Sequence, residues 1–142
     1  MKLAIIGSRT LRGSEVKTII DFVIKNAKNP IDTIVSGGAN GVDAQAECYA
    51  KMHGIATKIY LPDYAAHGKR APLIRNLKII EECDALLAIW DGKSAGTAYT
   101  IRKAREAGKK VMVVQIDPQK NYIGVWPETR GRLPKQKRAL LR

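Results

Sequence analysis

The sequence is poor in the residues that build cross-linked or metal-binding proteins, and it has no long apolar run. It contains two cysteines and two histidines in 142 residues. Cys48 and Cys83 lack CxxC spacing, so we interpret them as small buried apolar residues and expect no disulfide and no metal site. No apolar run is long enough to cross a bilayer, and residues 1–7 lack a signal-peptide pattern. We therefore expect a cytoplasmic protein that uses no metal or other cofactor.

Acidic residues are also scarce, with 13 Asp and Glu against 25 Lys and Arg, which gives a net charge of +12. The excess is concentrated in residues 118–142, where seven basic residues stand against one acidic residue. Such a segment can bind nucleic acid or another polyanion. Because it carries no base-reading motif, we favour a solvated extension and keep nucleic-acid binding as an alternative. We divide the chain into a folded domain, residues 1–117, and a basic C-terminal extension, residues 118–142.

Apolar runs and helical patterns alternate along the first 117 residues. Continuous apolar segments predict buried strands at residues 3–6, 31–36, 56–61, 85–90 and 111–116. Apolar residues at helical spacing predict helices from Ser14, as N-cap, to 27, from 40 or 41 to 54, at 72–82 and at 95–108. Residues 62–70 predict a long polar loop, and Asp117-Pro118 ends the regular part. Strands that are apolar throughout indicate a parallel sheet with helices on both faces. We expect an α/β, Rossmann-like, doubly wound parallel sheet of about five strands.

The most informative stretch is residues 36–43, where an apolar strand ends in Ser36-Gly37-Gly38 and a helical pattern follows at once. This arrangement lets backbone N–H groups approach an anion closely, because glycine carries no side chain to block the approach. The spacing fits neither the dinucleotide fingerprint nor the P-loop. Taken alone, the stretch is equally consistent with a tight turn that binds nothing.

Every unusual loop of the chain follows a predicted strand. In a parallel sheet these loops share one edge, and ligands bind at that edge near the point where the strand order reverses. We therefore predict one ligand site built from several loops. The candidate ligand-binding residues are Gly7, Ser8, Arg9, Ser36, Gly37, Gly38, Ala39, Asn40, Asp43, Lys69, Arg75, Asn76, Asp91, Ser94, Gly96 and Thr97.

These candidates have different expected roles. Arg9 can hold a phosphate or carboxylate bidentately. The start of the helix at 95–108 offers a second anion-binding position, although Ser94 is also an ordinary N-cap. Asp91 can accept hydrogen bonds from ribose hydroxyls, and Tyr64 and His67 can cover a base or a ribose. No catalytic residue is identified, and Asp43 and Asp91 are the weak candidates.

Four motifs together resemble the YspA/YpsA-like branch of the SMF/DprA–LOG (SLOG) superfamily, over about residues 1–116. They are Gly7-Ser8-Arg9, residues 36–43, Gly68-Lys69 with Arg75-Asn76, and residues 91–97. The resemblance implies a Rossmann-like fold and a site for nucleotides or ribosylated nucleotide derivatives. The family includes sensors of nucleotide signals, DNA-binding relatives in natural transformation, and LOG-type phosphoribohydrolases.

One position departs from the LOG enzymes, which carry P-G-G-x-G-T-x-x-E with a glutamate implicated in catalysis. Gly96-Thr97 matches the glycine-threonine pair, but Thr100 stands in place of the glutamate. Threonine cannot supply the carboxylate that stabilises an oxocarbenium-like centre. The leading hypothesis is therefore a protein that binds a nucleotide or ADP-ribose-like ligand as a sensor, sequestering or nucleotide-pathway protein. The alternatives are an N-glycosidic or phosphoribosyl hydrolase and a single-stranded nucleic-acid-binding protein that uses the tail. A homo-oligomer is also kept open.

Overall fold

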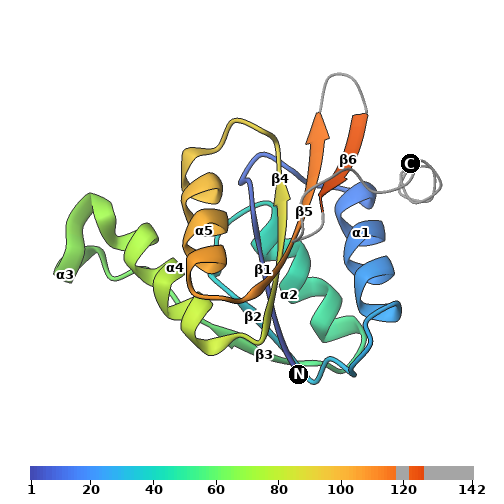
Figure 1. Cartoon of the computed structure of the whole chain (residues 1–142). Helices are drawn as coiled ribbons and strands as arrows, with labels where there is room; N and C mark the ends of the chain where they lie inside the picture. The colour runs from blue at the N-terminus through green and yellow to red at the C-terminus, as the bar shows by residue number, and fades with distance from the viewer. Residues whose placement is uncertain (118–121, 127–142) are drawn as a thin grey trace.

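The computed structural model describes residues 1–117 and the backbone of residues 122–126. Strands and helices alternate along this part of the chain (Figure 1). Their order is β1 (Lys2–Gly7), α1 (Ser14–Lys25), β2 (Thr33–Ser36), α2 (Val42–Met52), β3 (Ala56–Ile59), α3 (Tyr64–His67), the short 3-10 helix η1 (Gly68–Arg70), α4 (Ala71–Glu82), β4 (Ala85–Trp90), α5 (Ala95–Glu106), β5 (Lys110–Asp117) and β6 (Tyr122–Trp126).

The strands form one sheet in the order β3-β2-β1-β4-β5-β6. The first five strands are parallel, as the apolar runs predicted, and β6 pairs antiparallel with β5. The strand order reverses between β1 and β4, so the loops that follow these two strands border the expected ligand-binding edge. The prediction of a doubly wound α/β fold is confirmed.

Two apolar clusters fill the space between the sheet and its helices. Alternate residues of each central strand belong to different clusters: Leu3 and Ile5 of β1 pack with α1 and α2, whereas Ala4 and Ile6 pack with α4 and α5. In Figure 1 these two helix pairs accordingly lie on opposite faces of the sheet. Burial on both faces is the physical reason why the central strands β1 and β4 are apolar along most of their length, whereas the edge strand β3 is mostly exposed and carries Thr57 and Lys58.

Four local predictions need correction. Cys48 is exposed, so only Cys83 is the buried apolar residue that the sequence predicted. The first helix begins at Ser14 with Gly13 as its N-cap, and no side chain caps it, so Ser14 is not the cap. Residues 62–70 are not a simple loop, because they contain α3 and η1. Regular structure does not end at Asp117-Pro118, because β6 continues the sheet. The rest of the predicted extension, residues 118–121 and 127–142, lies outside the described residues.

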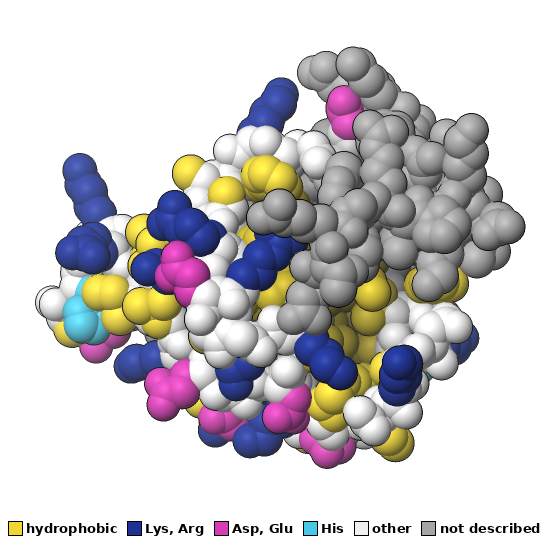
Figure 2. Space-filling view, in the orientation of Figure 1, with side chains coloured by type: hydrophobic (Ala, Val, Ile, Leu, Met, Phe, Trp, Pro, Cys, Tyr) yellow, Lys and Arg dark blue, Asp and Glu magenta, His cyan; other side chains and the backbone are white. Residues whose placement is uncertain are grey.

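Basic side chains are spread over the face seen in Figure 2, with acidic side chains between them. A contact between one acidic and two basic side chains supports the sheet edge formed by β3, whose residues Ala56, Thr57 and Lys58 are exposed. Glu82 Oε1, at the end of α4, accepts hydrogen bonds from Lys58 and from Lys2 of β1, both at 2.8 Å. No helix within the described residues is long and apolar enough to cross a membrane.

The central position of β1 gives a test of the core. Ile5 is fully buried between the sheet and the helices α1 and α2. We expect Ile5→Ala to lower the free energy of unfolding by about 2–5 kcal/mol, because it removes buried methyl groups and leaves a cavity. Urea denaturation measures the change. Met52→Ala, at a side chain that is 70% exposed, is the control and should change the value by less than ~0.5 kcal/mol.

Candidate functional site

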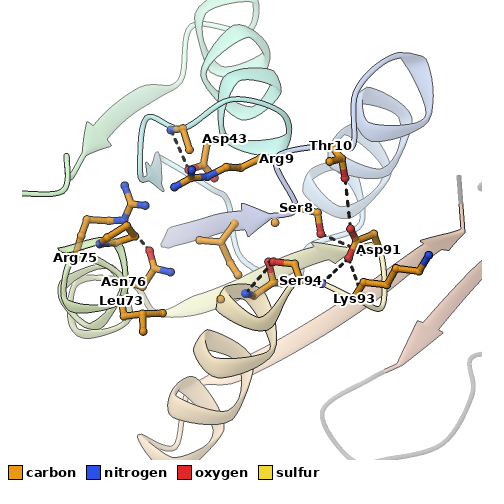
Figure 3. Close-up of a pocket in the computed structure, with 16 residues that line it drawn as sticks. Ser8, Arg9, Thr10, Asp43, Leu73, Arg75, Asn76, Asp91, Lys93 and Ser94 are labelled. Carbon is orange, nitrogen blue, oxygen red and sulfur yellow. Dashed lines mark hydrogen bonds between the residues drawn. The ribbon is translucent and has the colours of Figure 1, made fainter. Parts of the chain in front are cut away.

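A cavity of about 380 Å³ lies at the carboxyl ends of β1 and β4, where the strand order reverses (Figure 3). It is bordered by the loops after β1, β2 and β4 and by the first turns of α4 and α5. Its lining residues are Ile6, Gly7, Ser8, Arg9, Thr10, Ala39, Asp43, Pro72, Leu73, Arg75, Asn76, Asp91, Lys93, Ser94, Gly96 and Thr97. The cavity has the size and location of small-molecule sites in doubly wound folds.

Glycines in the loops after β1 and β2 bring these loops together. Gly41, at φ 75°, is the N-cap of α2, and a Cβ there would lie 2.5 Å from the carbonyl oxygen of Arg9. Gly38, at φ 70°, would place a Cβ 2.7 Å from Leu61. Both glycines are therefore required by backbone conformation and packing. The glycine-rich turn at 37–41 has a structural explanation independent of any ligand.

Gly37 makes room for two buried charged side chains, Asp43 and Arg75. A Cβ at Gly37 would lie 2.5 Å from Arg75 Nη1 and 2.9 Å from Asp43 Oδ2. Arg75 Nη1 donates to the carbonyl oxygens of Gly37 and, at 3.1 Å, of Tyr60, while its Nε donates to Asn76 Oδ1 at 2.7 Å. The guanidinium therefore ties α4 to the ends of β2 and β3.

Asp43 is 5% exposed, and its Oδ2 accepts a hydrogen bond from the backbone N–H of Ala39 at 3.2 Å. Burial raises the pKa of Asp43 to about 6, although the Ala39 N–H and the Arg75 charge partly oppose the shift. Burial likewise lowers the pKa of Arg75; the Asp43 carboxylate opposes this shift, and the nearby Arg9 charge adds to it. Arg9, Arg75 and the Asp43 carboxyl thus line one cavity, and the charges of Arg75 and Asp43 shift each other's ionisation.

Asp91 organises the loop between β4 and α5. Its Oδ1 accepts the backbone N–H groups of Lys93 and Ser94, both at 2.8 Å, and its Oδ2 accepts the hydroxyl of Thr10 at 3.4 Å. Its own N–H donates to Ser8 Oγ at 3.0 Å. Burial opposes ionisation, but these donors hold the pKa of Asp91 below its usual value. The carboxylate is engaged in building the loop, whereas the sequence suggested a ribose contact.

The first turn of α5 presents unpaired donors toward the cavity. Ser94 Oγ accepts the N–H of Thr97 at 3.4 Å and lies 3.1 Å from the Thr97 hydroxyl. The N–H groups of a helix's first turn have no partner within the helix, so those of Ala95 and Gly96 remain for a ligand. Trp90 Nε1 donates to the Ser94 carbonyl at 3.0 Å and fixes the approach to the helix.

Thr100 lies beneath this turn and is fully buried. Its hydroxyl donates to the Gly96 carbonyl at 2.9 Å and accepts from Asn76 Nδ2 at 2.8 Å. The residue that replaces the glutamate of the LOG motif therefore fixes Asn76 against the start of α5. A hydrogen-bonded chain runs from Gly96 through Thr100 and Asn76 to Arg75.

A second cavity, of about 220 Å³, borders the first. Its lining residues are Arg9, Gly37, Gly38, Ala39, Asn40, Pro62, Tyr64 and Arg75. Three of these, Arg9, Ala39 and Arg75, also line the first cavity. The two cavities therefore adjoin at a pair of arginines.

Fourteen of the sixteen candidate ligand-binding residues line one of the two cavities. The exceptions are Ser36, which is fully buried, and Lys69, which is exposed in η1. The lining residues that the sequence did not identify are Ile6, Thr10, Pro72, Leu73, Lys93 and Pro62. Their positions next to Arg9, Asp91 and the start of α4 are the signal that could have identified them.

The fold and the cavity define a class of protein: a small Rossmann-like domain with a polar, arginine-lined site at the switch point of its sheet. The chain belongs to the SLOG superfamily. A family model described as "YspA, cpYpsA-related SLOG family" matches residues 1–67, which extend from β1 to α3. Family membership points to nucleotide-related binding or processing. Arg75 and the start of α5 lie outside the matched segment.

The chain is also similar to a curated protein in sequence and to a solved structure in fold. The chain is 33% identical over 85 residues to the Gene 61 protein of Mycobacterium phage D29, covering 56% of this chain and 68% of the relative. The fold resembles DNA processing protein A (DprA) from Streptococcus pneumoniae, with a TM-score of 0.63 and 24% identity. That match covers 78% of this chain and 48% of the DprA chain, so this chain spans about half the DprA length.

The buried carboxyl of Asp43 gives a pH-dependent prediction. Its folded-state pKa of about 6 lies above the ordinary value of 3.8, so between these values the native state binds more protons than the unfolded state. We expect wild type to gain stability relative to Asp43→Asn as the pH falls from about 7 to about 4, by up to ~3 kcal/mol. Denaturant titrations of both proteins across this range measure the difference. Parallel pH profiles would contradict it.

Proposed function

We propose that the first cavity binds the phosphate of a nucleotide or a ribosylated nucleotide derivative at the start of α5. The observation that carries this proposal is the presence of glycine at position 96, where neither the backbone conformation nor the packing requires a glycine. A Cβ at Gly96 would have Leu73 Cδ2, at 4.0 Å, as its nearest neighbour. Each of the other glycines in residues 1–117 either has a positive φ or would place a Cβ in a clash with neighbouring atoms.

Glycine in a helix costs about 1 kcal/mol relative to alanine. At Gly96 neither packing nor backbone conformation requires it, but a Cβ would occupy space at the cavity wall. The absence of a side chain therefore supports close approach of a ligand to the free N–H groups of the first turn. These groups and the positive end of the helix dipole favour an anion.

The arginines support the same conclusion. Arg9 is exposed at the cavity and lies close enough to Arg75 for the two positive charges to repel each other. An anionic group held between two guanidinium groups offsets this repulsion and gains charged hydrogen bonds. Figure 3 shows Arg9 and Asp43 on one side of the cavity and Ser94, Asp91 and Lys93 at another.

The free energies of the individual contacts favour a ligand that reaches both the start of α5 and the arginines. A helix end contributes about 0.3–2 kcal/mol to anion binding, whereas micromolar affinity needs about 8 kcal/mol. Neither the α5 terminus nor one arginine suffices alone. A nucleotide, with a phosphate and a polar sugar, offers groups to both. We propose that the protein senses, sequesters or otherwise handles such a ligand.

Hydrolysis is the second candidate function, and Asp43 is the observation in its favour. A buried carboxyl of raised pKa in a cavity is a frequent property of catalytic groups. The position of the LOG glutamate is occupied by the buried Thr100, so Asp43 would have to provide the carboxylate. Binding of nucleic acid through the basic tail stays a prediction that lies mostly outside the described residues.

A thermal-shift screen with nucleoside monophosphates, cyclic nucleotides, NAD, ADP-ribose and short single-stranded DNA tests the function. A ligand at a hundred times its Kd should add about 2.7 kcal/mol of stability. Mass spectrometry then examines each stabilising compound. Recovery of the intact compound supports binding, and recovery of free base with ribose phosphate identifies a hydrolase. Stabilisation by DNA alone would contradict the proposed small-molecule function.

Gly96→Ala separates binding from folding. We expect the variant to fold with equal stability or up to ~1 kcal/mol more, because alanine is the better helix former and meets no neighbour. The ligand found in the screen should bind it at least ~10-fold more weakly, because the methyl group occupies the anion position. Isothermal titration calorimetry measures the affinity. Unchanged affinity would place the ligand elsewhere.

Arg9→Ala tests the second contact. Loss of a charged hydrogen bond should weaken binding of the same anionic ligand by about 1.5–3 kcal/mol. Arg102→Ala is the matched control, because Arg102 is 64% exposed on α5 and does not line either cavity. It removes the same charge and should leave the affinity unchanged. Equal losses in both variants would indicate a general effect of net charge rather than a contact.

A further inference from the structure

The second cavity has a composition different from the first. The first contains two carboxylates, Asp43 and Asp91, whereas the residues that line the second include no acid. Beyond the two shared arginines, the second cavity offers the ring of Tyr64, the ring of Pro62 and the amide of Asn40. A wall of one aromatic ring, one proline and one amide fits a flat, neutral group with hydrogen-bonding edges.

Tyr64 is placed by local structure rather than by the core. It is the first residue of α3, and Asp63 caps this helix by accepting the N–H of Ala66 at 3.0 Å. No residue of α3 is buried, and the Tyr64 side chain is 54% exposed. Figure 1 shows α3 projecting from the molecule beyond the N-terminal end of α4. The aromatic ring therefore contributes nothing to the packed core that would explain its presence.

The location of the ring relative to the phosphate position is the next step. The start of α5 and the Tyr64 wall belong to adjoining cavities, with Arg9, Ala39 and Arg75 between them. Arg75 is held in place by Gly37 and Tyr60, so the junction is rigid. If the phosphate of a ligand lies at the start of α5, the part of the ligand farthest from the phosphate is the part that can reach past the arginines into the second cavity.

We propose that the second cavity holds the base of the nucleotide, with the base stacked on Tyr64 and its edge facing Asn40. This inference rests on the proposed function, since it assumes that the phosphate lies at the start of α5. It makes Tyr64 a determinant of binding for nucleotides but not for a sugar phosphate without a base. An aromatic ring stacks on any base, so Asn40 is the group that can distinguish among them.

The test compares AMP, GMP, CMP and UMP with ribose 5-phosphate by calorimetric titration. For Tyr64→Ala we expect the tightest-binding nucleotide to lose ~10-fold or more in affinity, because one base–aromatic stack is lost. Ribose 5-phosphate should bind wild type and variant equally. Tyr64→Phe keeps the ring and should retain nucleotide affinity. Tyr99→Ala is the matched control, because it removes the same side chain from α5 at a residue that lines neither cavity.

The two proposals fail in different ways. If Gly96→Ala weakens the nucleotide and Tyr64→Ala does not, the base lies elsewhere and only this inference is overturned. Equal weakening of nucleotide and ribose 5-phosphate by Tyr64→Ala also overturns it, because the ring would then act on the sugar phosphate. If none of the five compounds binds wild type, this inference is overturned, whereas the proposed function is then decided by the cyclic nucleotides, NAD and ADP-ribose of the thermal-shift screen. Selective loss of nucleotide affinity in Tyr64→Ala, with Tyr99→Ala unchanged, supports the inference.

Discussion

The buried guanidinium of Arg75 is the interaction on which the site depends. A buried charge is costly unless hydrogen bonds and an opposite charge compensate it. The carbonyls of Gly37 and Tyr60, the Asn76 amide oxygen and the nearby Asp43 carboxylate provide that compensation. Because Gly37 follows β2 and Tyr60 follows β3, the Arg75 side chain of α4 fixes the relative positions of β2, β3 and α4.

Three of the residues that compensate Arg75, namely Gly37, Asp43 and Asn76, also line the cavities. Residues that stabilise the fold at the junction would therefore also meet a ligand bound there, and a change at one of them would affect both. The outer parts of the site differ in this respect. Arg9 is exposed and Gly96 is unpacked, so the fold does not explain either of them. Arg9 and Gly96 are therefore the positions at which a role in ligand binding can be tested separately from the stability of the fold.

The sequence predicted the parallel sheet because the central strands, buried on both faces, are apolar along most of their length. It also predicted most of the cavity, because loops after parallel strands share one edge. It could not assign individual roles. Asp91 looked like a ribose contact, yet its oxygens accept backbone N–H groups, and Gly37 looked like an anion contact, yet it makes room for Arg75. Lys69 is exposed in η1 and lines neither cavity, because charge and loop position do not determine which way a short 3-10 turn faces. Three-dimensional packing decides these assignments.

The edge strand β3 has a consequence for the behaviour of the protein at high concentration. No described strand pairs with its outer side, so its backbone groups are a template on which another chain can add a strand. Two features limit such growth: β3 has four residues, and it carries Lys58 held by Glu82. Resistance of this edge to strand addition therefore depends on a short strand and one tethered lysine. Neutralising that lysine would remove a safeguard against edge-to-edge aggregation that is unrelated to the ligand site.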